Sequence, residues 1–163
     1  MRTGIVGSIL LVLIASGGCG SNAQRAGIDD TLDRFHAAAS RADENAYFDC
    51  FAPEGVFIGT DATERWTVPA FRAYAHPHFA QGKGWSYRPT QRHVEFAPSG
   101  EVAWFDELLE DEKLGTCRGS GVLRRIDGRW RIAQYNLSIP IPNPQAKQVV
   151  ELIQSHATTK ESK

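Results

Sequence analysis

The most informative part of the chain is GSGVLRRIDGRWRIAQYNLS, which runs from Gly119 to Ser138. Asp127-Gly128 separates two segments rich in β-branched and aromatic residues, and this arrangement is typical of a two-residue β-hairpin turn. We therefore expect two long antiparallel strands, over residues 116–125 and 129–139.

Two further strand-like segments precede this hairpin, over residues 86–96 and 101–110. Turn residues separate them: Pro98-Ser99-Gly100 follows the first segment, and an acidic turn over residues 111–115 follows the second. Four long strands that follow one another in this way predict a curved antiparallel meander.

The residues before the meander have helical periodicity instead. Ile28, Leu32, Phe35 and Ala39 recur on one helical face. A short helix over residues 46–51, a strand over residues 56–58 and a third helix beginning after Thr67 follow. Helices before an antiparallel sheet predict an α+β fold in which three helices cover one face of the sheet and enclose a cone. We place this domain at residues 28–143, with a tail over residues 144–163 that holds a short amphipathic helix.

The N-terminus has the layout of a bacterial export signal over residues 1–18, with Arg2 before the apolar run Ile5 to Ala15. That run is too short to span a bilayer. Cys19 lies where lipoprotein precursors are cleaved and acylated, although Ser16 occupies the usual leucine position. Two destinations therefore stay open: a lipid anchor in the bacterial cell envelope, or a soluble secreted or periplasmic protein. Residues 19–27 are expected to form a flexible tether.

Composition excludes some partners. The chain has 18 basic and 19 acidic residues, with a net charge of −1, and it lacks a basic stripe, so a nucleic-acid partner is not expected. No group of Cys and His has zinc-ligand spacing, so neither a metal nor a cofactor is expected. Cys50 and Cys117 either form a disulfide or are two small buried residues.

These features resemble the SnoaL-like branch of the nuclear transport factor two superfamily, which has a cystatin-like fold. The resemblance rests on the element order, the run Phe51-Ala52-Pro53-Glu54-Gly55-Val56-Phe57 and the final hairpin, and it covers about residues 28–143. It implies a cone-shaped cavity and frequent dimerisation through the sheet. It also implies functions that range from isomerase and polyketide cyclase to ligand binding, so the fold alone does not select one.

The resemblance also implies which strand face points into the cone, because the branch often carries a cavity His at the position of Asn136. Residues two apart in a strand share a face, so Gln134 would accompany Asn136, and Trp104 would accompany Asp106. A buried Asp106 would have a raised pKa and is the candidate general base, with Arg118 as its partner. The alternative is a structural Asp106–Arg118 ion pair.

Other residues are assigned from their side-chain type and their position in the chain. Trp66, Trp85, Tyr87 and Tyr135 are expected to line the cavity mouth as amphipathic aromatic side chains, with packing in the core or in a dimer as the alternative. Glu107, Glu110, Asp111 and Glu112 are expected to form a solvated edge.

Three functions follow from this reading. The first is an exported protein that binds a small apolar molecule in its cone. The second is a cyclase, isomerase or dehydratase that uses Asp106 as its base, with Asn136 and Arg118 orienting the substrate. The third is an envelope module that dimerises through the sheet and fills the cone with its own side chains.

Overall fold

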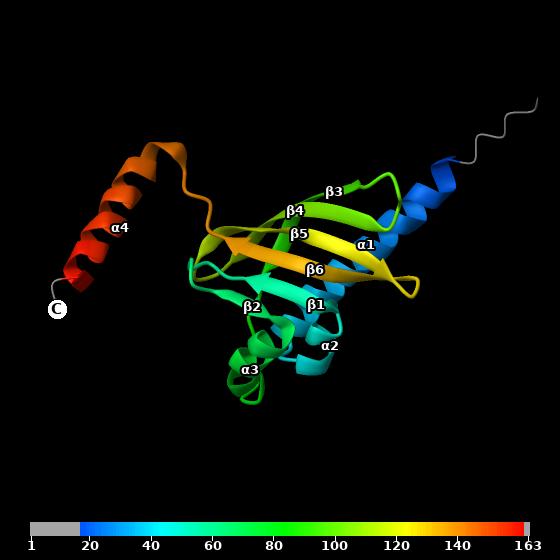
Figure 1. The fold of residues 1–163 in the computed structure, drawn as a ribbon, viewed down its shortest axis with the longest axis horizontal. Coiled ribbons are helices and arrows are strands. Elements are labelled where there is room, and N and C mark those ends of the chain that lie inside the picture. The colour runs from blue at the N-terminus through cyan, green and yellow to red at the C-terminus, as the bar shows by residue number, and fades with distance from the viewer. Residues whose placement is uncertain (1–16, 162–163) are drawn as a thin grey trace, which may run out of the picture.

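The computed structural model describes residues 17–161, and the predicted signal peptide lies outside this part except for its last two residues. Figure 1 shows the described chain as helices laid on one curved sheet, followed by a separate C-terminal helix. The helices are α1 (Gly17–Ser40), α2 (Glu44–Phe48), α3 (Val68–Phe79), the 3-10 helix η1 (Asn143–Gln145) and α4 (Ala146–Glu161). The strands are β1 (Phe51–Ile58), β2 (Arg65–Thr67), β3 (Arg88–Phe96), β4 (Val102–Asp111), β5 (Gly115–Ile126) and β6 (Arg129–Ser138).

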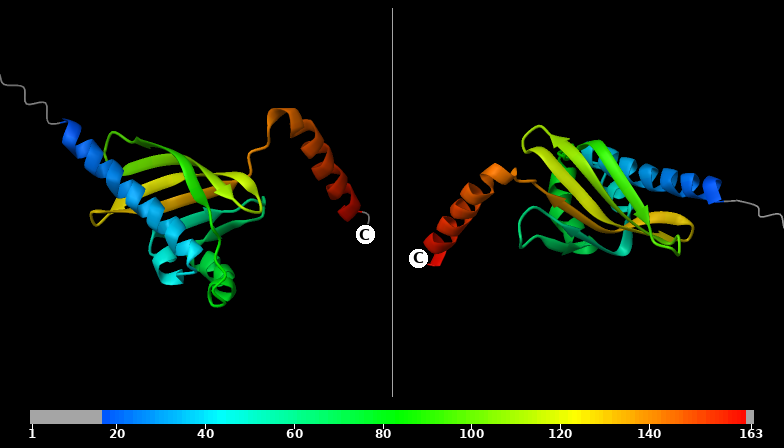
Figure 2. Two further views of the ribbon diagram at one scale, coloured as in Figure 1. Left: turned by 180° about the vertical axis from the view of Figure 1, so that it is seen from behind. Right: turned by 90° about the horizontal axis from the view of Figure 1, so that it is seen from above.

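The sheet has six strands in the order β2-β1-β6-β5-β4-β3. Strands β3 to β6 form the predicted antiparallel meander, and β1 extends it by pairing in parallel with β6. α1 crosses one face of the sheet diagonally, and α2 and α3 lie at the end of that helix (Figure 2). The α+β prediction is thus confirmed, whereas the parallel pair and the short strand β2 were not predicted.

The β5–β6 hairpin forms where Asp127-Gly128 predicts it. Ile126 faces Arg129 across the turn, and both turn residues have positive φ, 49° at Asp127 and 77° at Gly128. A two-residue turn of this kind requires positive φ at both positions, and glycine adopts it without a steric penalty. The turn fixes the register of the two longest strands and so helps to position the residues that face the cavity.

α1 is longer than the sequence predicts, and it corrects the interpretation of residues 19–27 as a flexible tether. These residues are helical. Arg25 pairs with Asp29 at 3.0 Å and donates a hydrogen bond to the carbonyl oxygen of Arg92 on β3. Gly27 lies against the Trp130 ring, so closely that a Cβ at Gly27 would be 3.1 Å from it. The segment lacks large apolar residues, but it is attached to the domain by polar contacts and by close packing.

The core lies between the helices and the concave face of the sheet. Ile28, Leu32 and Phe35 of α1 are buried there, as the helical periodicity predicts. Cys50 and Cys117 are also buried, and both are free thiols rather than a disulfide. Of the two alternatives drawn from the sequence, the structure therefore has the two small buried residues.

α4 stands away from the sheet in Figure 1. Its described side chains include the exposed apolar residues Val150, Leu152 and Ile153. It packs mainly against η1, the short helix that precedes it. Among the residues that the structure describes, no helix is long and apolar enough to cross a membrane.

Candidate functional site

A cavity of about 220 Å³ opens between the concave sheet face and the helices. α1 supplies one wall, β1, β2 and α3 supply another, and the loop before β3 closes the side. Most of the lining side chains are aromatic. They are Phe35, Tyr47, Phe57, Trp66, Phe71, Tyr74, Trp85, Tyr87 and Tyr135, and the remaining lining residues are His36, Ala39, Gly59, Thr60, Glu64, Leu114 and Leu137.

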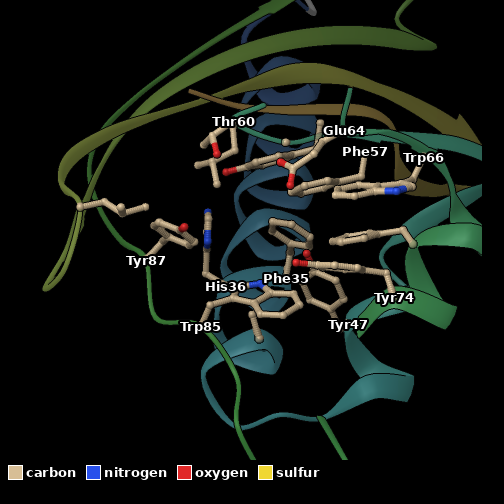
Figure 3. Close-up of a pocket in the computed structure, with 16 residues that line it drawn as sticks. Phe35, His36, Tyr47, Phe57, Thr60, Glu64, Trp66, Tyr74, Trp85 and Tyr87 are labelled. Carbon is tan, nitrogen blue, oxygen red and sulfur yellow. The ribbon is translucent and has the colours of Figure 1, made fainter. Parts of the chain in front are cut away.

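Several of these rings are parallel (Figure 3). Phe57 and Phe71 stack with centroids 4.0 Å apart and an interplanar angle of 15°. Trp66 stacks on Tyr74 at 4.9 Å and 20°, and Phe57 is within 3° of the plane of Tyr135 at 5.8 Å. These rings cover one another's faces, so together they form a packed, largely apolar wall of the cavity.

A buried polar cluster lies behind the cavity lining and centres on Glu107 of β4, which is 1% exposed. Its Oε1 is 2.6 Å from Nε2 of His36 on α1 and accepts a hydrogen bond from the Tyr135 hydroxyl at 3.1 Å. Its Oε2 accepts a hydrogen bond from Nε of Arg92 at 2.9 Å. His36 and Tyr135 reach the cavity surface, so the buried carboxylate is connected to the cavity through two proton-carrying side chains.

The charge of Glu107 is stabilised despite its burial. Burial alone would raise its pKa, but hydrogen bonds and charge interactions with His36 and Arg92 outweigh that effect and hold the pKa below its ordinary value. Burial raises the pKa of Tyr135 well above its usual value, and the neighbouring charge of Glu107 raises it further. Glu107 is therefore an ionised acceptor, and Tyr135 remains a protonated donor.

Arg92 connects this carboxylate to the N-terminal half of α1. Its Nη1 lies 3.2 Å from Asp29 and 2.9 Å from Asp33, both of which precede His36 on the helix. Its side chain is only 10% exposed. Arg92 thus bridges three carboxylates, and it fixes α1 relative to β3 and β4 at the level of the cavity base.

Gly119 provides the space that this arrangement needs. A Cβ at this position of β5 would lie 2.2 Å from the Tyr135 hydroxyl and 3.1 Å from Cγ of Glu107. Any larger residue would displace the hydroxyl, so the glycine is required by the close approach of the Tyr135 side chain to the strand.

Tyr47 also belongs to the cavity wall, and its hydroxyl differs from that of Tyr135 in its surroundings. The Tyr47 side chain is fully buried; among the described residues its oxygen makes no hydrogen bond of standard geometry, and the Trp85 side chain interacts with it. Burial raises the pKa of Tyr47 well above its usual value, so this hydroxyl is protonated at neutral pH. The hydroxyl oxygen is inaccessible to solvent, so it lies within the aromatic wall and not at the cavity surface.

A family model for the SnoaL-like domain matches residues 28–142. The chain belongs to the SnoaL-like domain family. Comparison with curated proteins finds no match for this SnoaL-like chain.

Solved structures share the fold. A Mycobacterium tuberculosis protein of unknown function is 21% identical with a TM-score of 0.65, and the match covers 82% of each chain. A nuclear transport factor two-like protein of unknown function from Pseudomonas putida is 18% identical with a TM-score of 0.62, over 75% of this chain and 90% of the other. A candidate scytalone dehydratase from Novosphingobium aromaticivorans is 10% identical with a TM-score of 0.62, over 74% and 87%. At these identities the likeness concerns the fold alone.

Four of the aromatic residues predicted from the sequence lie in the cavity of this SnoaL-like domain. Trp85 and Tyr135 line it, although Tyr135 is buried, and so do Trp66 and Tyr87. Burial raises the pKa of Tyr87 to about 12, and the charge of Asp111 adds to this shift. The side chains of Trp66 and Tyr87 are partly exposed, which agrees with a position near the opening.

The other predicted site residues lie on the opposite, helix-free face of the sheet. Asp106 faces Ser120, and Ser120 faces Asn136, so the candidate base and the candidate orienting amide share one row of that face. Trp104 is 48% exposed, and Gln134 and Arg118 are also exposed. The described residues contain no ion pair between Asp106 and Arg118. The hypothesis that Asp106 is a cavity base is therefore wrong, and so is its structural ion-pair alternative.

A β-bulge explains this error. Val122 pairs with Gln134 but Leu123 pairs with Ile132, so Ala133 is an extra residue in β6. Ile132 and Tyr135 are both buried although they are three residues apart. Strict alternation through this point assigns the end of β6 to the wrong face.

The sequence interpretation also missed the residues at the cavity base. Glu107 was assigned to a solvated edge together with Glu110, Asp111 and Glu112, but only Glu107 is buried. Its position in the apolar row Ala103, Phe105 and Leu109 could have revealed it. His36 carries a similar signal, because it lies one helical turn after Leu32 on the buried face of α1.

Two further expectations concern the contents of the cone. The described residues contain no group of three or more His, Cys, Asp or Glu side chains that could hold a metal ion. The third function hypothesis required a cone filled by its own side chains, whereas the cavity is open to solvent. The structure thus favours the two hypotheses that use the cavity.

Proposed function

We propose that this SnoaL-like domain binds a small, largely apolar molecule in its cone. The observation that carries the proposal is the cavity itself, with its largely aromatic lining. Its volume of about 220 Å³ is at the small end of ligand pockets, so a molecule of one or two rings fits better than a larger one.

Binding of a neutral two-ring probe tests this proposal. Isothermal titration calorimetry with 2-naphthol should give saturable binding to the wild type. Thr60→Trp places a bulky side chain at the exposed mouth of the cavity and should abolish the signal. Ala62→Trp is the matched control, because residue 62 is exposed on the same loop but does not line the cavity. Equal binding by both variants would contradict the proposal.

A second function is supported by the geometry at the cavity base, namely proton transfer to or from the bound molecule. The His36–Glu107 contact is made through Nε2, so Nδ1 is the ring nitrogen that can meet a ligand. In the neutral form of the ring, with its Nε2–H bonded to Glu107, Nδ1 would remove a proton from a carbon next to a carbonyl group. The electron pair of the broken C–H bond would move into an enolate, and Glu107 would stabilise the imidazolium that forms. A dehydratase or isomerase reaction begins with such a step.

Proton exchange measures this step directly. In D₂O, the wild type should accelerate deuterium uptake at the α-carbon of 2-tetralone, followed by NMR. His36→Gln should lower the rate by about 10²-fold or more, since it removes the base. Asp106→Asn should leave the rate unchanged, because that side chain lies on the other face. A loss of exchange in Asp106→Asn but not in His36→Gln would exclude this assignment.

The N-terminal part of the sequence supports export, with Cys19 as the site of lipid attachment and the bacterial cell envelope as the destination. Metabolic labelling with palmitate should mark the wild type and Cys50→Ala but not Cys19→Ala. An unlabelled wild type found in the soluble periplasmic fraction would favour the secreted alternative. Dimerisation through the helix-free sheet face also belongs to this proposal.

A further inference from the structure

Charge is distributed unevenly over the lining of the cavity. The lining contains no Lys or Arg, and its carboxylate is Glu64, which lies in the segment between β1 and β2. Figure 3 shows Glu64 above Phe35 and beside Phe57, with its carboxylate turned toward the cavity. The other acid of the region, Glu107, lies behind His36 and is neutralised by Arg92.

The position of Glu64 is held by the local backbone. Its Oε2 accepts a hydrogen bond from the amide of Asp61 at 3.2 Å, and the Glu64 carbonyl accepts another from the Gly59 amide at 2.9 Å. Gly59 permits this fold of the loop, because a Cβ there would lie 2.2 Å from Oε2 of Glu64. The carboxylate is therefore placed at the opening rather than free to turn into solvent.

Aromatic side chains surround the space below this carboxylate. Trp66 and Tyr74 stack at its outer side, and Trp85 and Tyr87 lie across the cavity. The faces of aromatic rings attract cations, by about 0.5–2 kcal/mol depending on how far the cation is desolvated. A carboxylate together with several aromatic side chains, without a basic residue, is the combination that binds a substituted ammonium group.

We infer that the cavity selects a cationic ligand, a flat ring that carries a substituted ammonium group, and that Glu64 is the residue that determines this specificity. The inference rests on the proposed function, because it names the ligand class of the same cavity. In this arrangement the ring lies between the aromatic walls, and the ammonium group lies at the mouth beside Glu64. A carboxylate-bearing ligand of the same size would be repelled there.

The test compares isosteric probes that differ in charge. Phenyltrimethylammonium and tert-butylbenzene have nearly the same shape, and 4-tert-butylbenzoate adds a negative charge. By competition against 2-naphthol, the wild type should bind the cation about 10-fold or more tightly than the neutral isostere, and it should bind the anion most weakly. Glu64→Gln should remove the preference for the cation.

The control variant is Glu112→Gln, which removes the same charge from an exposed turn close to Leu114 at the mouth. It should keep the preference. Tighter binding of tert-butylbenzene than of phenyltrimethylammonium, or an unchanged preference in Glu64→Gln, would overturn the inference and leave the proposed function intact. Failure of 2-naphthol itself to bind would instead refute the proposed function.

Discussion

Glu107 is the residue on which the polar base of the cavity depends, since His36, Arg92 and Tyr135 all bond to its carboxylate. A buried charge of this kind is tolerated only while its partners remain in place. The protonation state of Glu107 therefore also affects the free energy of unfolding of the domain.

Acid should remove this contribution. Because the folded-state pKa of Glu107 is below its unfolded value of about 4.3, the stabilisation is fully present above that value and is lost as pH falls through the folded pKa. At pH 7, Glu107→Gln should lower the free energy of unfolding by about 3 kcal/mol. Urea denaturation of both proteins from pH 7 to pH 3 should show the difference shrinking below about pH 4.

Glu110→Gln is the control for this experiment, because Glu110 lies on the same strand but is not part of the cavity base. Its effect should be below about 1 kcal/mol, because Glu110 is only partly buried and, among the described residues, accepts a single surface hydrogen bond, from the Thr116 hydroxyl. A difference between wild type and Glu107→Gln that stays constant down to pH 3 would contradict the lowered pKa.

A second prediction for a single residue concerns Gly119. Gly119→Ala should destabilise the domain by about 1–3 kcal/mol, because its methyl group would overlap the Tyr135 hydroxyl. In a Tyr135→Phe background the hydroxyl is absent, so the same substitution should cost less. Thermal unfolding of the four proteins gives the coupling energy, and a value near zero would refute the steric explanation.

At the scale of elements, the first residues of α1 can be tested, because the sequence predicts a flexible tether there and the structure has a helix. Ala26 is exposed and lies within the helix. Ala26→Pro should lower the free energy of unfolding by about 3 kcal/mol, and Ala26→Gly by about 1 kcal/mol. If residues 19–27 were a tether, chemical denaturation would show no effect of either change.

The strands show where sequence reasoning succeeds and where it fails. The meander and its final turn were predicted because alternation and Asp-Gly are local signals, and β3 to β6 lie close to the expected ranges. The assignment of strand residues to the two faces of the sheet does not follow from local sequence signals. It depended on the bulge at Ala133, which only pairing with β5 defines, and this moved Asn136 out of the cone. His36 and Glu107 were missed because their pairing joins residues 71 positions apart.

At the scale of the whole molecule, the helix-free sheet face remains to be assigned a partner. It carries the exposed Trp104 opposite Val122. If the domain dimerises through this face, as we propose, Trp104→Glu should give a monomer in sedimentation velocity experiments. Leu152→Glu, on the exposed apolar side of α4, should remain dimeric. A dimer lost only in Leu152→Glu would assign the interface to α4 instead.

The continuous helix α1 has a consequence for an acylated form of the protein. An α-helix rises about 1.5 Å per residue, so His36 can stand up to roughly 26 Å from Cys19 along the axis. The headgroup layer of one leaflet is only about 5–8 Å thick. With a lipid on Cys19, α1 would act as a rigid spacer that holds the cavity base beyond the headgroups. A ligand would then enter from the aqueous phase rather than by lateral diffusion out of the bilayer.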